Sequence, residues 1–209
     1  MKIAWILGWA VPEAWFEPLA RAAFPRAAHR FVAAEPDALL KLAAEAPFDW
    51  VAGYSLGTLL LLAGAIQAGS WGKVALLAPI FAFPREADLG GKVFRAQLRH
   101  FARQLARDPR AALADFYHRA GLDVPPDAAA QTLESLLWGL ERLENERVAP
   151  PLPAGWRAWC GADDALLDAA RLHAIEPSVT IVGGATHHPA GLLRAFAEES
   201  SRTEGGSRK

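Results

Sequence analysis

The chain of 209 residues contains a single cysteine, Cys160, and its formal charge at pH 7 is −1. One cysteine cannot form a disulfide within the chain, and the sequence offers it no second ligand for a metal site, so we expect neither a disulfide nor a metal. Cys160 lies in an apolar run and is expected to pack as a small hydrophobic side chain. Because acidic and basic residues are balanced, we expect no nucleic-acid partner.

Long apolar runs are also lacking. No segment reaches the roughly 18 uninterrupted apolar residues that a membrane-spanning helix needs. The apolar start Ile3–Val11 is broken at Gly8, is followed by Pro12 and has no small-x-small cleavage site, so it is interpreted as a strand rather than a signal peptide. We therefore expect no membrane partner and a cytoplasmic location. Hydrophobic residues form 52% of the chain, which supplies a core for one compact domain.

Short strand-like runs alternate with helical patterns in the first part of the chain. This alternation predicts a parallel sheet with helices on both faces, which binds ligands at the carboxyl ends of its strands. Residues Lys2–Ala10 are expected to form a strand and the loop after it. The other expected strands are His29–Ala34, Phe48–Ala52 and Val74–Pro79, and the expected helices are Pro12–Phe24, Asp37–Ala46 and Leu59–Ile66.

One motif stands between an apolar strand and an apolar helix. Gly53–Gly57 reads G-x-S-x-G, and in this setting it is typical of a nucleophile elbow, in which Ser55 projects above the sheet from a strained turn. Its two glycines allow strand and helix to pass closely. The alternative is that Ser55 is only a small residue in a tight turn.

Two later strand-like runs end in chemically active side chains. The run that begins at Trp156 ends in Asp163 and Asp164. A run near the C-terminus ends in His187 and His188. A serine hydroxyl becomes a good nucleophile when an imidazole takes its proton and an acid orients that imidazole. The alternatives are an acid that caps a helix and a histidine that is buried and hydrogen-bonded.

Serine, acid and histidine in this order resemble the α/β-hydrolase superfamily, over nearly the whole chain up to about residue 198. The resemblance implies an α/β-hydrolase fold with a trimmed, mostly parallel sheet of about six strands, helices on both faces and an inserted helical cap. The family pattern places a glycine three residues before the acid, so Gly161 selects Asp164. The His-x-Pro pattern selects His187, while Asp163 and His188 stay as alternatives.

The same resemblance assigns the oxyanion hole to the backbone amides of Trp9 and Leu56, directed at the charge that develops on the carbonyl oxygen. This chain carries Leu7-Gly8 where many relatives carry His-Gly. The two strands that usually precede this point are missing, which is why the sheet is expected to be trimmed.

No strand is predicted between Pro84 and Pro153. Residues 84–153 are expected to form a helical cap with helices at 88–107, 110–119 and 127–146, inserted into a core of residues 1–83 and 154–199. A cap of this size shapes the acyl pocket. The polar, Gly/Ser-rich residues 200–209 are expected to be a disordered tail.

Arginines recur every four residues along the first cap helix, at Arg95, Arg99, Arg103 and Arg107. Such a stripe is an ordinary solvated face or a docking surface, formed by Arg95, Arg99 and Arg103, for an acidic acyl carrier protein. Within the superfamily the chain most resembles pimeloyl-acyl-carrier-protein methyl ester esterases. The similarity lies in Gly8-Trp9, in aromatic-Ser-Leu-Gly at 54–57 and in the arginine-bearing cap, whereas Ala10 and Thr58 depart from that group.

The sequence thus predicts a serine carboxylic-ester hydrolase without a cofactor. Its catalytic residues are Ser55, Asp164 and His187, and its substrate is a small-molecule or carrier-protein-linked ester. The finer prediction is release of methanol from pimeloyl-acyl-carrier-protein methyl ester in biotin synthesis. The alternatives are a broad short-chain esterase, a thioesterase, and a non-catalytic carrier-protein or ligand binder on the same scaffold. The sequence leaves the oligomeric state open, and a monomer fits its length.

Overall fold

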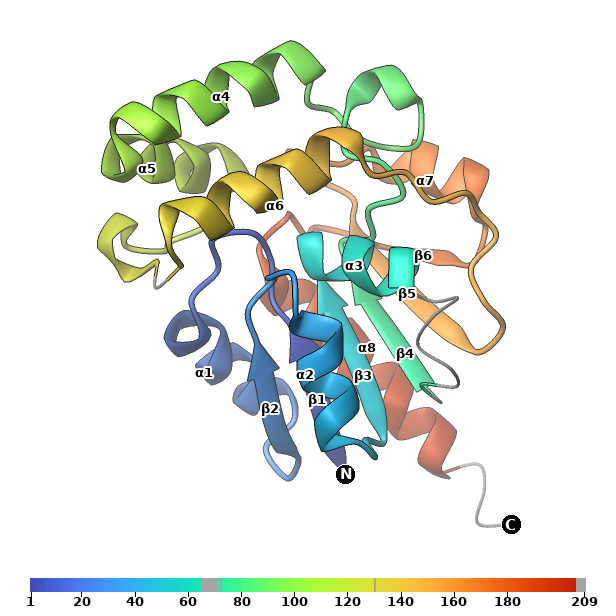
Figure 1. Ribbon diagram of the computed structural model, residues 1–209. Helices are drawn as coiled ribbons and strands as arrows, with labels where there is room; N and C mark the ends of the chain where they lie inside the picture. Colours follow the sequence, from blue (N-terminus) through green and yellow to red (C-terminus); the bar gives the residue numbers. More distant parts are fainter. Residues whose placement is uncertain (65–70, 72, 130, 206–209) are drawn as a thin grey trace.

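The centre of the molecule is a parallel sheet (Figure 1). A computed structural model describes residues 1–64, 71, 73–129 and 131–205. Within them, six strands follow the order β2-β1-β3-β4-β5-β6, and every neighbouring pair is parallel. The strands are β1 (Lys2–Ile6), β2 (Ala28–Val32), β3 (Trp50–Tyr54), β4 (Lys73–Leu77), β5 (Trp156–Gly161) and β6 (Val179–Val182).

Helices cover both faces of this sheet, as the alternating pattern predicts. On one face lie α1 (Glu13–Ala23) and α8 (Pro189–Gly205), and on the other lie α2 (Ala38–Glu45) and α3 (Leu56–Gly64) (Figure 1). The short helix α7 (Ala169–Ile175) connects β5 to β6. Phe196 of α8 packs against three sheet tryptophans, Trp5, Trp50 and Trp159, with ring centroids 4.9 to 6.2 Å away. Buried aromatic area on this face therefore fixes α8 to the sheet.

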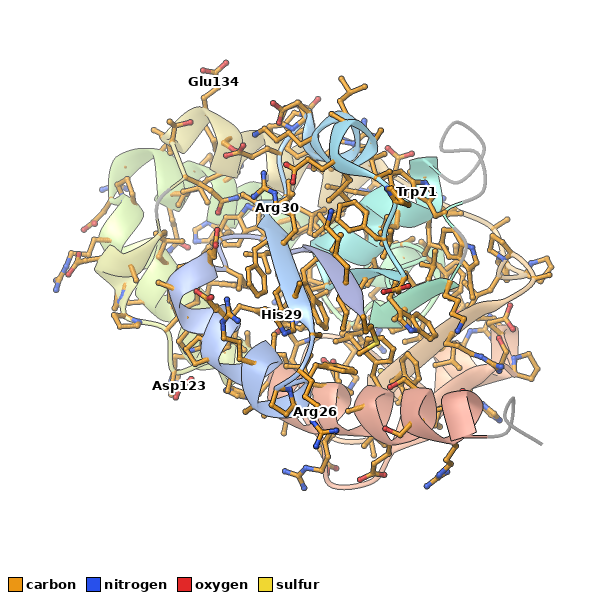
Figure 2. The ribbon with its side chains drawn as sticks, turned by 90° about the horizontal axis from the view of Figure 1, so that it is seen from below. Arg26, His29, Arg30, Trp71, Asp123 and Glu134 are labelled. Carbon is orange, nitrogen blue, oxygen red and sulfur yellow. The ribbon has the colours of Figure 1, made fainter. Side chains whose placement is uncertain are left out.

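The edge strand β2 carries two polar side chains, His29 and Arg30, and both have partners on neighbouring elements. His29 accepts a hydrogen bond at Nδ1 from Trp5 Nε1 at 3.0 Å, and its Nε2 lies 3.1 Å from the Phe24 carbonyl oxygen. The neighbouring Arg30 forms an ion pair with Glu45 of α2 at 2.8 Å. Figure 2 shows His29 and Arg30 together on this strand. Charge on an exposed edge discourages pairing with another chain.

Three cap helices lie over the carboxyl end of the sheet (Figure 1). They are α4 (Arg95–Arg107), α5 (Pro109–Ala120) and α6 (Leu133–Asn145), and short 3-10 turns precede α4 at Arg85–Ala87 and α6 at Pro126–Ala128. Local capping fixes the start of α5, because Asp108 accepts from the Ala111 amide and Pro109 occupies the first turn.

The first cap helix begins later than the predicted residue 88. Residues 84–93 instead form a loop in which Pro84 bridges to Val93 and Gly91 bridges to Leu167. The Lys92 amide donates to the Leu166 carbonyl at 2.9 Å. Pairing with a distant segment therefore overrides local helix propensity in this stretch.

The C-terminal helix continues past the expected end of the core. α8 extends through Ser200 to Gly205, so the disordered tail predicted from residue 200 does not begin there. Both Ser200 and Ser201 donate their hydroxyls to the Ala197 carbonyl at 2.9 Å, which satisfies these polar groups within the helix. The remainder of the predicted tail, 206–209, and the predicted helix end at Ile66 lie outside the described residues.

Candidate active site

The turn between β3 and α3 has the geometry of the predicted elbow. Ser55 adopts a left-handed conformation with φ of 51°. A Cβ atom on Gly57 would lie 2.1 Å from the Ile6 carbonyl oxygen, and one on Gly53 would lie 2.8 Å from the Gly57 backbone. Both glycines are thus required for the close passage of backbone past backbone. The strained turn places Ser55 at the carboxyl end of the sheet.

Ser55, His187 and Asp164 form one hydrogen-bonded line. The Nε2 atom of His187 lies 3.1 Å from Ser55 Oγ, and its Nδ1 lies 2.8 Å from Asp164 Oδ2. All three side chains are buried, with exposed fractions of 8%, 1% and 1% for serine, histidine and aspartate. Since an ionised carboxylate only accepts, the Nδ1 atom carries the proton and Nε2 is free to accept the serine proton.

Backbone amides hold the Asp164 carboxylate. Its Oδ1 atom accepts from the amides of Leu166 at 2.8 Å and Leu167 at 2.9 Å. Burial by itself would raise the pKa of Asp164, but the adjacent His187 and these two amides outweigh it and hold the pKa below its ordinary value. The carboxylate is therefore ionised at neutral pH and stabilises a positive charge on the His187 ring.

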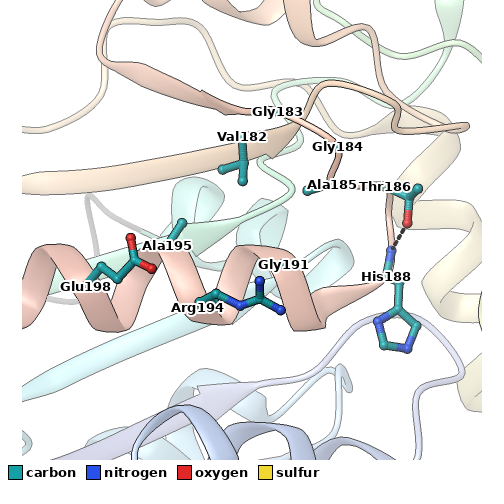
Figure 3. Close-up of a pocket in the computed structure, with 10 residues that line it drawn as sticks. All are labelled: Val182, Gly183, Gly184, Ala185, Thr186, His188, Gly191, Arg194, Ala195 and Glu198. Carbon is teal, nitrogen blue, oxygen red and sulfur yellow. Dashed lines mark hydrogen bonds between the residues drawn. The ribbon is translucent and has the colours of Figure 1, made fainter.

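The alternative acid and histidine lie apart from this line. Asp163 is exposed. His188 places Nε2 at 3.3 Å from Asp123 Oδ1, and its ring meets that of Trp15 edge-on at 5.2 Å. Figure 3 shows the His188 ring pointing away from the other residues of a separate surface pocket. The geometry thus brings Asp164 and His187 to Ser55, and leaves Asp163 and His188 outside.

Supporting contacts around the site escaped the sequence patterns. Buried Tyr54 donates its hydroxyl to the His187 carbonyl at 2.8 Å. Thr58 donates to the Ser55 carbonyl at 2.7 Å and accepts from the Ile80 amide at 2.9 Å. From the sequence, Thr58 is only a departure from the family pattern. In the structure its hydroxyl ties the elbow to the loop that follows β4, a long-range contact with no local signal.

The two amides predicted for the oxyanion hole belong to the ends of neighbouring elements. Trp9 follows β1, which pairs with β3, and Leu56 is the first residue of α3. An amide in the first turn of a helix has no acceptor within that helix. Among the residues described, no acceptor is found for either amide. Ala10 has a φ of 56°, which explains why a glycine would suit that position.

A cavity of ≈590 Å³ lies beside the site and under the cap. Its lining includes Trp9, whose amide is predicted for the oxyanion hole, and Ala165 and Leu166, which follow Asp164 in the chain. Its apolar wall comes from the cap and the loop before it, through Val93, Phe101, Phe116, Leu140 and Leu143. Such a cavity can hold an apolar group of moderate size.

The arginines predicted to dock a carrier protein differ in their surroundings. Glu144 of α6 accepts from Arg99 Nε at 2.6 Å and lies 3.9 Å from Arg95 Nη1. Arg103 is exposed, and no ion-pair partner for it occurs in the described part of the chain. Two of the three arginines therefore join α4 to α6, and Arg103 alone keeps an uncompensated charge.

Within the described ranges, no group of three or more His, Cys, Asp or Glu side chains is arranged to hold a metal ion. None of the helices in the described part of the chain combines the length and the apolar character that crossing a membrane requires.

Comparison of the sequence with protein-family models and with curated proteins gives no match. Solved structures do match. An esterase from Exiguobacterium antarcticum is similar with a TM-score of 0.74 and 12% identity, over 97% of this chain and 91% of that one. A putative aryl esterase from Burkholderia cenocepacia has a TM-score of 0.62 and 13% identity, over 98% and 91%. An N-acyl homoserine lactonase bound to N-hexanoyl homoserine lactone has a TM-score of 0.56 and 13% identity, over 100% and 90%.

These similarities extend over nearly the full length of each chain, so they concern the whole architecture rather than one motif. At identities of 12 to 13% they establish the fold and leave the activity to be argued from the site. The predicted fold class is confirmed: this chain has the α/β-hydrolase fold, with a parallel sheet of six strands among its described residues.

Proposed function

We propose that this protein is a serine carboxylic-ester hydrolase. The observation that carries the proposal is the buried line of hydrogen bonds from Ser55 through His187 to Asp164. Each group has the chemical state that its role needs: a hydroxyl in reach of a ring nitrogen, a ring with its other nitrogen on a carboxylate, and a carboxylate kept ionised by that ring and by two backbone amides. The esterases with a similar fold add support of a general kind.

In the first half of the reaction, Ser55 Oγ attacks the ester carbonyl carbon while its proton passes to His187 Nε2. Asp164 stabilises the resulting imidazolium. The carbonyl oxygen becomes negatively charged, and the amides of Trp9 and Leu56 donate to it. The carbonyl then re-forms as the bond between the acyl carbon and the alkoxy oxygen breaks, and His187 gives its proton to the departing alkoxy oxygen, which leaves as the alcohol.

In the second half, water enters where the alcohol left. His187 Nε2 takes a proton from this water, and the oxygen attacks the acyl-serine carbonyl carbon. The bond to Ser55 Oγ breaks, His187 protonates the serine, and the carboxylic acid is released. No redox step or cofactor is needed.

The cavity beside Asp164 supports an apolar acyl or aryl group on the ester. Its volume of ≈590 Å³ falls within the ordinary range for small-molecule sites, and rings and aliphatic side chains form much of its wall. A short-chain or medium-chain ester fits this description, and a thioester would use the same apparatus.

The test is turnover of p-nitrophenyl butyrate by the wild type and by Ser55→Ala. We expect the variant to lose on the order of 10⁴-fold or more in kcat. Ser201→Ala, an exposed serine of α8, serves as the matched control and should behave as wild type. If the wild type is as inert as Ser55→Ala across several acyl chains, the protein is instead a ligand or carrier-protein binder on the same scaffold.

The finer proposal is that the ester is the methyl ester of a pimeloyl group carried by acyl carrier protein. It rests on the sequence resemblance, on the cap arginines and on the size of the cavity. We expect Arg103→Glu to weaken hydrolysis of the carrier-linked substrate at low salt but not that of p-nitrophenyl butyrate. Arg202→Glu, an exposed arginine at the end of α8, is the control.

Arg95 and Arg99 are less suited to this test, because reversing their charge would also break their ion pairs with Glu144. Growth of a biotin-requiring bacterium that lacks its own pimeloyl esterase, after supply of this chain, would support the finer proposal. If growth fails while p-nitrophenyl esters are hydrolysed, the substrate is a different ester and the hydrolase proposal stands.

A further inference from the structure

Trp9 belongs to the core loop after β1, yet its side chain is surrounded by the cap. Trp9 is 2% exposed, and its indole Nε1 donates to the Leu136 carbonyl of α6 at 2.8 Å. Its ring meets Phe101 of α4 with centroids 5.6 Å apart and Phe116 of α5 at 4.8 Å, both edge-on. Residues from all three cap helices therefore contact the side chain whose own backbone amide is assigned to the oxyanion hole.

Gly139 of α6 also lies against the Trp9 indole. A Cβ atom on this glycine would lie 2.5 Å from Trp9 Cδ1 and 3.0 Å from Trp9 Nε1. It would also lie 3.1 Å from Cδ2 of Leu56, the residue that carries the second oxyanion amide. A glycine inside a helix costs about 1 kcal/mol of stability relative to alanine. Here the missing side chain is what lets α6 lie directly on both oxyanion residues.

The next residue of the loop is held by a second cap helix. Ala10 adopts a left-handed conformation with φ of 56°, and its carbonyl accepts a hydrogen bond from the Tyr117 hydroxyl of α5. Burial raises the pKa of Tyr117 to about 12, so the hydroxyl keeps its proton and donates throughout the neutral range. The conformation of the Trp9–Ala10 turn is thus fixed from outside the sheet that carries it.

We propose that Gly139 is a positioning residue: by admitting the Trp9 indole against α6, it sets the direction of the Trp9 amide and so the strength of the oxyanion hole. The inference rests on the proposed ester hydrolysis and deepens it. It makes the cap part of the catalytic apparatus as well as a wall of the cavity, because one residue, Trp9, forms both the cavity lining and an oxyanion donor.

The test is Gly139→Ala, measured on p-nitrophenyl butyrate. The added methyl group must displace the indole and turn the amide behind it. Loss of one oxyanion donor typically lowers kcat by about 10²-fold to 10³-fold. A donor that is only misdirected should cost no more than this, so we expect kcat to fall by between about 10-fold and about 10³-fold. The rise in KM should stay below about threefold, because the interaction lost belongs to the transition state.

A second readout separates positioning from general damage. A trifluoromethyl ketone forms a hemiketal on the serine whose oxyanion uses the same amides, so its affinity should fall by the same factor as kcat/KM. Gly64→Ala is the matched control. It too is a buried glycine of a helix, and its Cβ would meet Cδ1 of Leu39, a residue of α2 rather than of the cap, at 2.3 Å. The Leu39 side chain can rotate away from the added methyl group, so we expect this variant to fold and to keep both kcat and inhibitor affinity.

A double-mutant cycle tests the contact itself. Trp9→Phe removes the pyrrole edge that the new methyl group would strike, so Gly139→Ala should cost clearly less kcat in that background than in the wild type. Tyr117→Phe is the independent variant should Gly139→Ala fail to fold. It releases the Ala10 carbonyl, and kcat is expected to fall about threefold or more with little change in KM.

The inference is overturned if folded Gly139→Ala has wild-type kcat and inhibitor affinity, or if its loss is equally large in the Trp9→Phe background. If Gly139→Ala does not fold, a Tyr117→Phe variant with wild-type kcat overturns it. A wild type that hydrolyses no ester at all would instead remove the proposed function, so the two failures are distinguishable.

Discussion

Replacing Asp164 by asparagine should disable the site through the tautomer of His187 while leaving its shape intact. In the structure Oδ1 accepts from two backbone amides, those of Leu166 and Leu167, and Oδ2 accepts from His187 Nδ1. An asparagine has one acceptor oxygen and one NH₂ donor group. The oxygen must face the two amides, since an NH₂ group there would set donors against donors. The NH₂ group then faces His187.

A donor opposite Nδ1 forces that nitrogen to become the acceptor and moves the ring proton to Nε2. This nitrogen lies 3.1 Å from Ser55 Oγ and can no longer take the serine proton. We expect kcat on p-nitrophenyl butyrate to fall by about 10⁴-fold, which corresponds to about 5.4 kcal/mol in the activation free energy. KM should change little, because the carboxylate does not line the space for the ester.

Asp163→Asn is the matched control, since it makes the same change one residue earlier on an exposed side chain. It should retain wild-type kcat. Circular dichroism and the thermal midpoint establish that both variants are folded. An Asp164→Asn variant that keeps more than about a tenth of the wild-type kcat while Asp163→Asn is impaired would refute the assignment of the acid.

Further predictions concern stability and reactivity. Gly57→Ala should destabilise the fold by about 3 kcal/mol or more in urea unfolding, because its Cβ would lie 2.1 Å from the Ile6 carbonyl oxygen, and an unchanged midpoint would contradict the close passage. Burial lowers the pKa of His29, and the folded state favours the neutral ring that accepts from Trp5. As the pH falls, His29 therefore takes up a proton more readily in the unfolded chain than in the folded protein. The stability that His29 contributes is present above about pH 6.5 and is lost as the pH falls below that value. His29→Phe should flatten this part of the stability profile. Burial raises the pKa of the Cys160 thiol to about 12, so a thiol-specific disulfide reagent should label it only after denaturation, and rapid labelling of the native protein would count against the packing described.

Local patterns in the sequence predicted most of the core. The alternation of strands and helices, the G-x-S-x-G turn and the acid and histidine at strand ends all depend on residues close together in the chain. For this reason the element order, the parallel sheet and the elbow at Ser55 could be predicted from the sequence. Helix boundaries were less predictable: α4 starts at Arg95 rather than 88, because residues 84–93 pair with a segment near Leu167.

Family patterns favoured Asp164 and His187, but only the structure shows why their neighbours are excluded. Asp164 is buried and accepts hydrogen bonds from two backbone amides, whereas Asp163 is exposed to solvent. The His188 ring lies near Asp123. The arginine stripe illustrates the opposite case. Its helical spacing is visible in the sequence, yet the partner of Arg99 is Glu144, 45 residues away.

The sequence by itself determined the fold class and the chemical groups available, because period and turn chemistry are encoded within a few residues. The tertiary structure alone decided which groups meet and what holds them. The contact of Gly139 with Trp9 joins residues on separate elements with no shared motif. Its physical basis is close packing between a cap helix and a core loop, and packing of that kind depends on where whole elements come to lie.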